Sequence, residues 1–170
     1  DVGAAYMGLQ VLEREKQVFL ANPDMQPELD NNSYVVLRQL KPSARFDIIH
    51  ELRELGVVPT SMIDSSDGLA AEILHLCEAS GTGARIFEKN IPIDDETYLA
   101  ATEFNLSPLT AALNGGEDYE LVFTVSQADF DKVEKIADVT AIGYMTDLKN
   151  EKVMVMKSDQ IVNLTAPGFN

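Results

Sequence analysis

The sequence predicts an α+β fold, a mixed α/β sandwich in which helices cover a largely antiparallel or mixed sheet. Segments with helical spacing of apolar residues alternate with short runs of β-forming residues, in an irregular order. Glycine and proline separate many of these segments. The chain has 170 residues, of which 45% are apolar and 24% are charged, a composition typical of a globular protein with a real core. We therefore expect a single domain over residues 1–170.

The first third of the chain is expected to be helical. Residues 2–20 have the pattern of an amphipathic helix, and the proline-containing segment 22–32 that follows is expected to be a loop. Ser33 is a candidate cap for a short helix through Gln39. A further helix is expected over residues 46–55. Its inward face is predicted to hold Phe46, Ile49, Leu52 and Leu55, and Gly56 is expected to end it.

The middle of the chain is expected to form a short strand whose last residues are 61–63, and then a tight turn. A helix over residues 69–80 follows and ends at Gly81. Cys77 lies on the apolar face of this helix, so we expect it in the core rather than as a nucleophile. A strand over residues 84–87 follows, and then a helix that begins at the acidic residues 94–96.

The last third is expected to be rich in strands. Residues 119–125 predict a strand, and residues 126–137 predict a helix with Phe130, Val133 and Ile136 facing inward. Further strands are expected over residues 140–145, 153–156 and 160–164.

The charge balance argues against two classes of partner. Acidic residues outnumber basic ones by 28 to 13, and the formal net charge is −15, so neither nucleic acid nor an anionic membrane is expected to bind. Nucleotide phosphates remain compatible, because divalent cations can lie between them and carboxylates. The apolar runs are too short to span a membrane, no secretory signal is visible, and a lone cysteine agrees with a reducing compartment. We expect a cytoplasmic protein.

Residues 62–69 contain the first candidate site, with two carboxylates and two hydroxyls at a strand-to-helix turn. The first N–H groups of a helix are unpaired and suit a phosphate oxygen. Asp64 and Asp67 would supply the hard oxygen ligands that Mg²⁺ prefers, and Ser66 would donate to a phosphate. The alternative is structural, because Ser65, Ser66 and Asp67 are all good helix caps.

Residues 113–125 contain the second candidate site. Gly115 and Gly116 permit a positive φ or a close approach of the backbone to a ligand. Glu117 and Asp118 would then lie at the mouth of the following strand. An acidic turn that simply leads into a strand is the alternative interpretation.

In this order, the runs IDSSDGL (63–69) and GGEDYEL (115–121) resemble the thiamine-monophosphate kinase family, and so does the run SGTGA (80–84). The family is related to aminoimidazole ribonucleotide synthetase, selenophosphate synthetase and the hydrogenase maturation factor HypE. The resemblance implies an aminoimidazole ribonucleotide synthetase C-terminal-domain-like fold, with a mixed sheet covered by helices. It also implies that this chain is the C-terminal domain of a larger two-domain enzyme. The other domain would bind ATP and metal and form a homodimer.

For the activity, the resemblance implies transfer of the γ-phosphoryl group of ATP to thiamine monophosphate with Mg²⁺, giving thiamine diphosphate. It implies that Asp64 and Asp67 bind the metal and that Ser66 binds ATP phosphate. It implies that Glu117 and Phe169 contact the thiamine substrate. No residue is assigned a catalytic role.

Two other functions stay open at this point. One is a non-catalytic module that binds metal or phosphate, and the other is a superfamily relative that acts on another small ATP-activated substrate. The run GGEDYE favours the thiamine substrate over the second of these. Because the other domain carries most of the family's metal and ATP contacts, we expect this chain alone to fold but to have little or no kinase activity.

Overall fold

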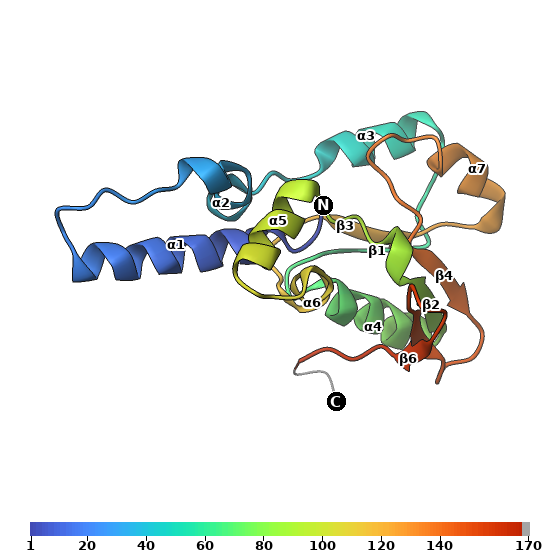
Figure 1. Ribbon diagram of the computed structural model, residues 1–170. Coiled ribbons are helices and arrows are strands. Elements are labelled where there is room, and N and C mark those ends of the chain that lie inside the picture. The colour runs from blue at the N-terminus through green and yellow to red at the C-terminus, as the bar shows by residue number, and fades with distance from the viewer. Residues whose placement is uncertain (168–170) are drawn as a thin grey trace.

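The computed structural model, described here for residues 1–167, is a mixed α/β fold with two sheets (Figure 1). The larger sheet has the strand order β4-β2-β5-β6. Its strands are β2 (Gly83–Phe87), β4 (Gly143–Thr146), β5 (Lys152–Val155) and β6 (Ile161–Asn163). β2 pairs parallel to β5 and antiparallel to β4, and β6 pairs antiparallel to β5. This confirms the predicted mixed sheet.

The smaller sheet is an antiparallel pair of strands, β1 (Ser61–Asp64) and β3 (Leu121–Thr124). Successive side chains of a strand point to opposite faces, and the two faces of this pair join different parts of the core. Val122 packs with the cluster around α4, whereas Leu121 and Phe123 pack with the cluster around α3. The candidate site lies at the end of this covered pair.

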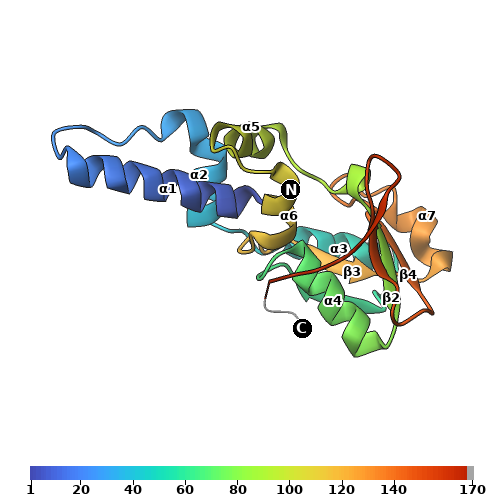
Figure 2. The same cartoon turned by 60° about the horizontal axis from the view of Figure 1, so that its bottom comes forward.

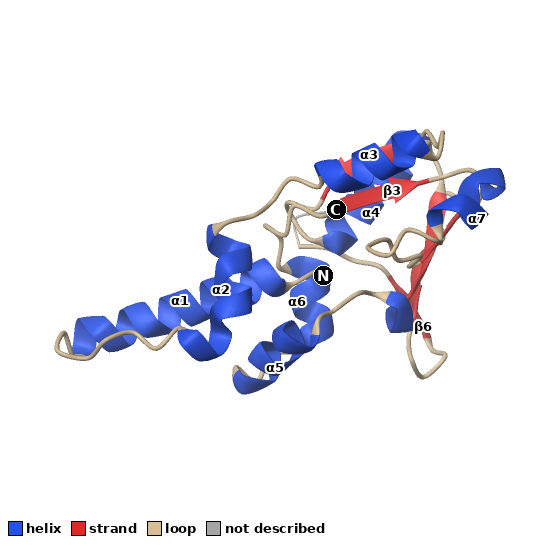
Figure 3. Cartoon of the chain, turned by 90° about the horizontal axis from the view of Figure 1, so that it is seen from above, coloured by secondary structure: helices blue, strands red, loops and turns tan. Residues whose placement is uncertain are grey.

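Helices pack against both sheets. They are α1 (Ala4–Ala21), α2 (Ser33–Leu40), α3 (Phe46–Glu54), α4 (Leu69–Ser80), α5 (Asp95–Glu103), α6 (Pro108–Asn114) and α7 (Phe130–Val133), with 3-10 turns at Asp30–Asn32, Glu88–Asn90 and Gln127–Asp129. Turning the molecule shows α1 and α2 side by side, extending away from the sheets (Figure 2). Seen from above, α3, β3 and α4 lie over one another (Figure 3). Among the described residues, no helix is long and apolar enough to cross a membrane.

The buried apolar side chains form three clusters in the described part of the chain. The first packs α4 on the larger sheet, the second joins α1 to α2, α5 and α6, and the third lies between α3, α7 and the smaller sheet. Cys77 is buried in the first cluster, and burial raises the pKa of its thiol. Its predicted place in the core is confirmed.

The predicted inward face of α3 is wrong except at Leu52. Phe46 is 76% exposed and Ile49 and Leu55 are also exposed, while Ile48 and Leu52 are buried. Residues spaced by three drift around a helix by about 60° at each step, so Phe46 and Leu55 lie on opposite sides of it. Ile48 and Leu52 are four apart and share a face.

Other predicted elements differ in their limits. α1 begins at Ala4 because Gly3 has a φ of 90°, and Ser33 is the first residue of α2 rather than its side-chain cap. The helix expected over residues 126–137 is reduced to a 3-10 turn and α7. Phe130 is exposed there, whereas Val133 and Ile136 are buried as expected.

Candidate functional site

The two motifs found in the sequence are hydrogen-bonded to each other. Beyond the last strand pair, Asp64 with Leu121, the ladder continues irregularly through the motif residues. Ser65 N–H donates to Glu120 O at 2.7 Å, and Tyr119 N–H donates to Ser65 O at 2.9 Å. Glu117 N–H donates to Ser66 O at 2.8 Å. The turn after β1 and the segment before β3 therefore form one structural unit.

The glycines of both motifs allow this close approach. Gly116 has a φ of 72°, and a Cβ atom there would lie 2.5 Å from Ser66 O. Gly68 has a φ of 109°, and its Cβ would lie 2.7 Å from Leu113 O. Both positions thus need glycine for conformation and for space. The positive φ allowed for in the sequence is found at Gly116, and the close approach seen here is made to the backbone of the other motif. An approach to a ligand stays a prediction.

Asp64 and Asp67, the predicted metal ligands, lie on either side of the turn, and both are exposed. In residues 1–167, neither carboxylate forms an ion pair with a basic residue, and no group of three or more His, Cys, Asp or Glu side chains is arranged to hold a metal. Two exposed carboxylates without a basic partner suit Mg²⁺, which usually binds one or two carboxylates plus waters and phosphate oxygens. Their role as metal ligands stays a prediction.

Ser66, the predicted ATP-binding residue, is already bonded to a carboxylate of α4. Glu72 is only 2% exposed. Its Oε1 atom accepts from Asp67 N–H at 2.9 Å, from Ser66 N–H at 3.2 Å and from the Ser66 hydroxyl at 3.4 Å. The N–H groups of Ser66 and Asp67, in the turn before α4, therefore have an internal acceptor.

Glu117, the predicted substrate-binding residue, is exposed and has a positive φ of 62°. Tyr119 has a φ of 52°, and its hydroxyl donates to Glu117 Oε2 at 2.8 Å. The hydrogen bond to Glu117 raises the pKa of Tyr119, and the charge of Asp64 acts in the same direction. Tyr119 thus bonds directly to the residue that the resemblance assigns to the substrate.

Asp118 points away from Glu117 and caps α1. Its carboxylate is 3% exposed and accepts from Gly3 N–H at 2.6 Å and from Ala5 N–H at 3.0 Å. Burial raises the pKa of this carboxyl, and the two hydrogen bonds oppose the rise. Ionised or not, Asp118 supplies the acceptor that the first N–H groups of α1 lack locally.

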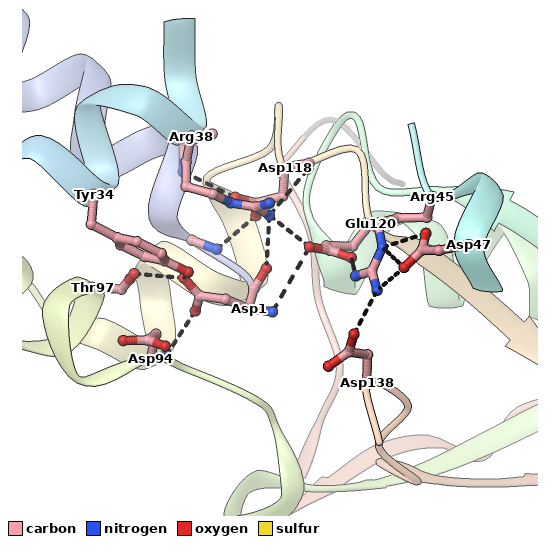
Figure 4. A network of polar contacts seen from close by, with 12 residues as sticks. Asp1, Tyr34, Arg38, Arg45, Asp47, Asp94, Thr97, Asp118, Glu120 and Asp138 are labelled. Atoms are coloured by element: carbon pink, nitrogen blue, oxygen red, sulfur yellow. Dashed lines mark hydrogen bonds and ion pairs between the residues drawn. The ribbon is translucent and has the colours of Figure 1, made fainter. Parts of the chain in front are cut away.

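Glu120 joins the second motif to two arginines (Figure 4). Its Oε1 accepts from Arg38 at 2.7 Å, and its Oε2 accepts from Arg45 at 2.6 Å. Arg45 also bonds Asp47 at 2.8 Å and pairs with Asp138 at 3.5 Å. Arg38 belongs to α2 and Arg45 precedes α3, so Glu120 fixes the motif to both helices.

Four residues at this site were not identified as functional from the sequence. They are Glu72, Asp118, Tyr119 and Glu120. Asp118 and Glu120 act through residues far away in the sequence, such as Gly3, which lies 115 positions before Asp118. Glu72 and Tyr119 instead bond residues two to six positions away. The available signal for Glu72 was an acid within the apolar face of a helix, and for Tyr119 it was membership of the second motif. Phe169, the other predicted substrate-binding residue, lies outside the described residues.

Comparison with known proteins agrees with this architecture. Residues 12–156 match the model of the family described as AIR synthase related protein, C-terminal domain. The chain is 34% identical to thiamine-monophosphate kinase of Escherichia coli (strain K12), over 99% of this chain and 49% of the relative. It is 32% identical to that of Buchnera aphidicola subsp. Schizaphis graminum, over 100% of this chain and 50% of the relative. The chain thus spans about half the length of these relatives.

Solved structures give the same result. A structure described as AaThiL complexed with AMPPCP and TMP superimposes with a TM-score of 0.70 at 25% identity, over 94% of this chain and 46% of the other. Thiamine monophosphate kinase from Aquifex aeolicus superimposes with a TM-score of 0.72 at 24% identity, over 98% of this chain and 49% of the other. Homologous to the C-terminal half of thiamine-monophosphate kinases, the chain belongs to the AIR synthase related protein C-terminal domain family.

Proposed function

We propose that this chain is the C-terminal domain of a two-domain kinase that transfers the γ-phosphoryl group of ATP to thiamine monophosphate, giving thiamine diphosphate. The observation that carries the proposal is the hydrogen-bonded union of the two motifs, with Glu117 N–H donating to Ser66 O at 2.8 Å. It is supported by similarity to thiamine-monophosphate kinases along nearly the whole chain. A homodimer formed through the other domain is part of this proposal.

The proposed roles follow from the chemistry of each side chain. Asp64 and Asp67 would hold Mg²⁺, which supplies positive charge that neutralises the phosphate oxygens during transfer. Ser66 would donate to ATP phosphate once its hydroxyl turns from Glu72, whose oxygen is 3.4 Å away. Such a long bond is weak, so this exchange costs little. Glu117 would accept a hydrogen bond from an amine of the thiamine pyrimidine, with Phe169 as a further substrate contact.

The test is calorimetric titration of thiamine diphosphate, and separately of ATP, into the 170-residue chain, with and without Mg²⁺. We expect binding that requires Mg²⁺. Asp67→Asn and Glu117→Gln should each weaken it about tenfold, because each removes one charged contact to the ligand or its metal. Asp131→Asn, on the exposed side of α7, is the matched control and should leave binding unchanged.

The outcomes separate the candidate functions. Weakening in both site variants supports a single site formed by the two motifs. Binding of Mg²⁺ and ATP without binding of thiamine diphosphate would instead favour a relative with another substrate. No Mg²⁺-dependent binding of either ligand would contradict the proposed roles of both motifs.

A further inference from the structure

In the described part of the chain, the polar groups of the Tyr119 and Glu117 side chains bond only to each other. The Tyr119 hydroxyl donates to Glu117 Oε2 at 2.8 Å. Glu117 Oε1 accepts no hydrogen bond from the described residues, and the Glu117 side chain is exposed. One oxygen of the carboxylate is thus held by the protein, and the other is available to a ligand.

The backbone around this pair is strained, and it is held in place by its surroundings. Glu117 and Tyr119 both have positive φ, at 62° and 52°. This conformation is uncommon for residues other than glycine and is unfavourable at each position. Bonds from both N–H groups to the turn after β1 hold it, as does the buried carboxylate of Asp118 between them. Strain of this kind clusters at functional sites.

Successive side chains of residues 117–120 bond to different partners. Asp118 and Glu120 bond to the start of α1 and to the two arginines, so they anchor the segment. Glu117 and Tyr119 bond to each other. The anchored residues therefore fix the backbone from which the other two project.

We infer that Tyr119 is a positioning residue for Glu117: its hydroxyl holds one carboxylate oxygen so that the other meets an amine donor of the substrate. This inference rests on the proposed function, because it requires Glu117 to bind the thiamine pyrimidine. Without the hydroxyl, the exposed Glu117 side chain samples several rotamers, and ordering it costs part of the binding free energy.

The test is calorimetric titration of thiamine monophosphate, with Mg²⁺ present, into the 170-residue chain and its variants. Tyr119→Phe keeps the ring and removes only the hydroxyl, and we expect it to bind about tenfold more weakly. Tyr98→Phe is the matched control, since Tyr98 is an exposed tyrosine on α5, and it should bind within about twofold of wild type. The double variant with Glu117→Gln should bind no more weakly than Glu117→Gln alone.

A second measurement separates positioning from general destabilisation. The chain has five tyrosines and no tryptophan, so tyrosinate absorbance is easily followed against pH. Subtracting the titration of Tyr119→Phe isolates Tyr119. Its pKa is raised by the hydrogen bond to Glu117, so Glu117→Gln should lower it toward the ordinary tyrosine value. The thermal midpoint of Tyr119→Phe should match that of wild type, because its hydroxyl bond is exposed.

The two proposals fail in different ways. If wild type binds thiamine monophosphate and Tyr119→Phe binds equally well, the positioning role is wrong and the proposed function stands. If Glu117→Gln leaves the Tyr119 titration unchanged, the positioning role is also wrong. If wild type does not bind at all, both proposals are contradicted.

Discussion

Glu72 places a negative charge at the N-terminus of α4, where a phosphate oxygen was expected from the sequence. Its Oε1 accepts from Ser66 N–H at 3.2 Å and from Asp67 N–H at 2.9 Å. A phosphate that approaches this turn therefore meets a carboxylate as well as the two N–H groups. Metal ions between the phosphate and the acids would remove this repulsion, which agrees with a site that uses Mg²⁺.

Replacing Glu72 should destabilise the fold, because two turn N–H groups lose their acceptor. We expect Glu72→Ala to lower the free energy of unfolding by about 3 kcal/mol. Glu72→Gln keeps an acceptor oxygen and should cost only about 1 kcal/mol. Glu78→Ala, on the exposed face of the same helix, should stay within about 0.5 kcal/mol. Urea unfolding measures all three, and equal stability of Glu72→Ala and Glu78→Ala would show that the bond is unimportant.

At the scale of elements, the limits of a helix were predicted best where the apolar periodicity and the residues at its two ends indicate the same limits. α4 has apolar residues at helical spacing and glycine at each end, and its observed limits, Leu69–Ser80, are those expected. The turn before it was also located correctly. Here the local rules are sufficient, because capping and periodicity are properties of neighbouring residues.

Other elements depend on partners that a local pattern does not reveal. Ser107 and Pro108 are helix start signals, but α6 has only seven residues and was not predicted. The strand expected from Tyr119 begins at Leu121, because left-handed residues at 117 and 119 cannot pair regularly. For the site, the sequence identified the two motifs but not the anchoring roles of Asp118 and Glu120, which need contacts across the fold.

The junction of the two motifs should tolerate no side chain at Gly116. Gly116→Ala adds a Cβ atom 2.5 Å from Ser66 O in a left-handed conformation, and we expect a loss of about 3 kcal/mol in unfolding free energy. Gly56 provides the matched control. Its φ is also left-handed, at 65°, but a Cβ there meets nothing within 4 Å, so Gly56→Ala should cost only about 1 kcal/mol.

Thermal unfolding of the two glycine variants gives the comparison directly. The difference between them isolates the clash from the backbone strain, since both positions carry the strain. Equal losses would mean that the turn after β1 moves to make room, and that the two motifs are not tightly joined.

At the scale of the whole molecule, the chain covers about half the length of its thiamine-monophosphate kinase relatives. We predict that the 170-residue chain forms little or no thiamine diphosphate from ATP and thiamine monophosphate, even when it binds ligand, because transfer needs both reactants aligned. Chromatographic detection of thiamine diphosphate tests this, with E. coli thiamine-monophosphate kinase as the positive control. Rapid turnover by the chain alone would contradict the prediction.

The order in which the strands pair has a consequence for how the chain folds. Each strand of the smaller sheet finds its partner far along the sequence, as in the pair Ser61 with Thr124. β2 pairs only with strands that come later in the chain, β4 and β5. The N–H groups at the start of α1 are bonded by Asp118, 115 residues after Gly3. Contacts so distant in sequence slow folding, because loop entropy is lost before the contacts form. During synthesis, helices can form as they emerge, but both sheets and the site between the motifs close only when the last third of the chain is available.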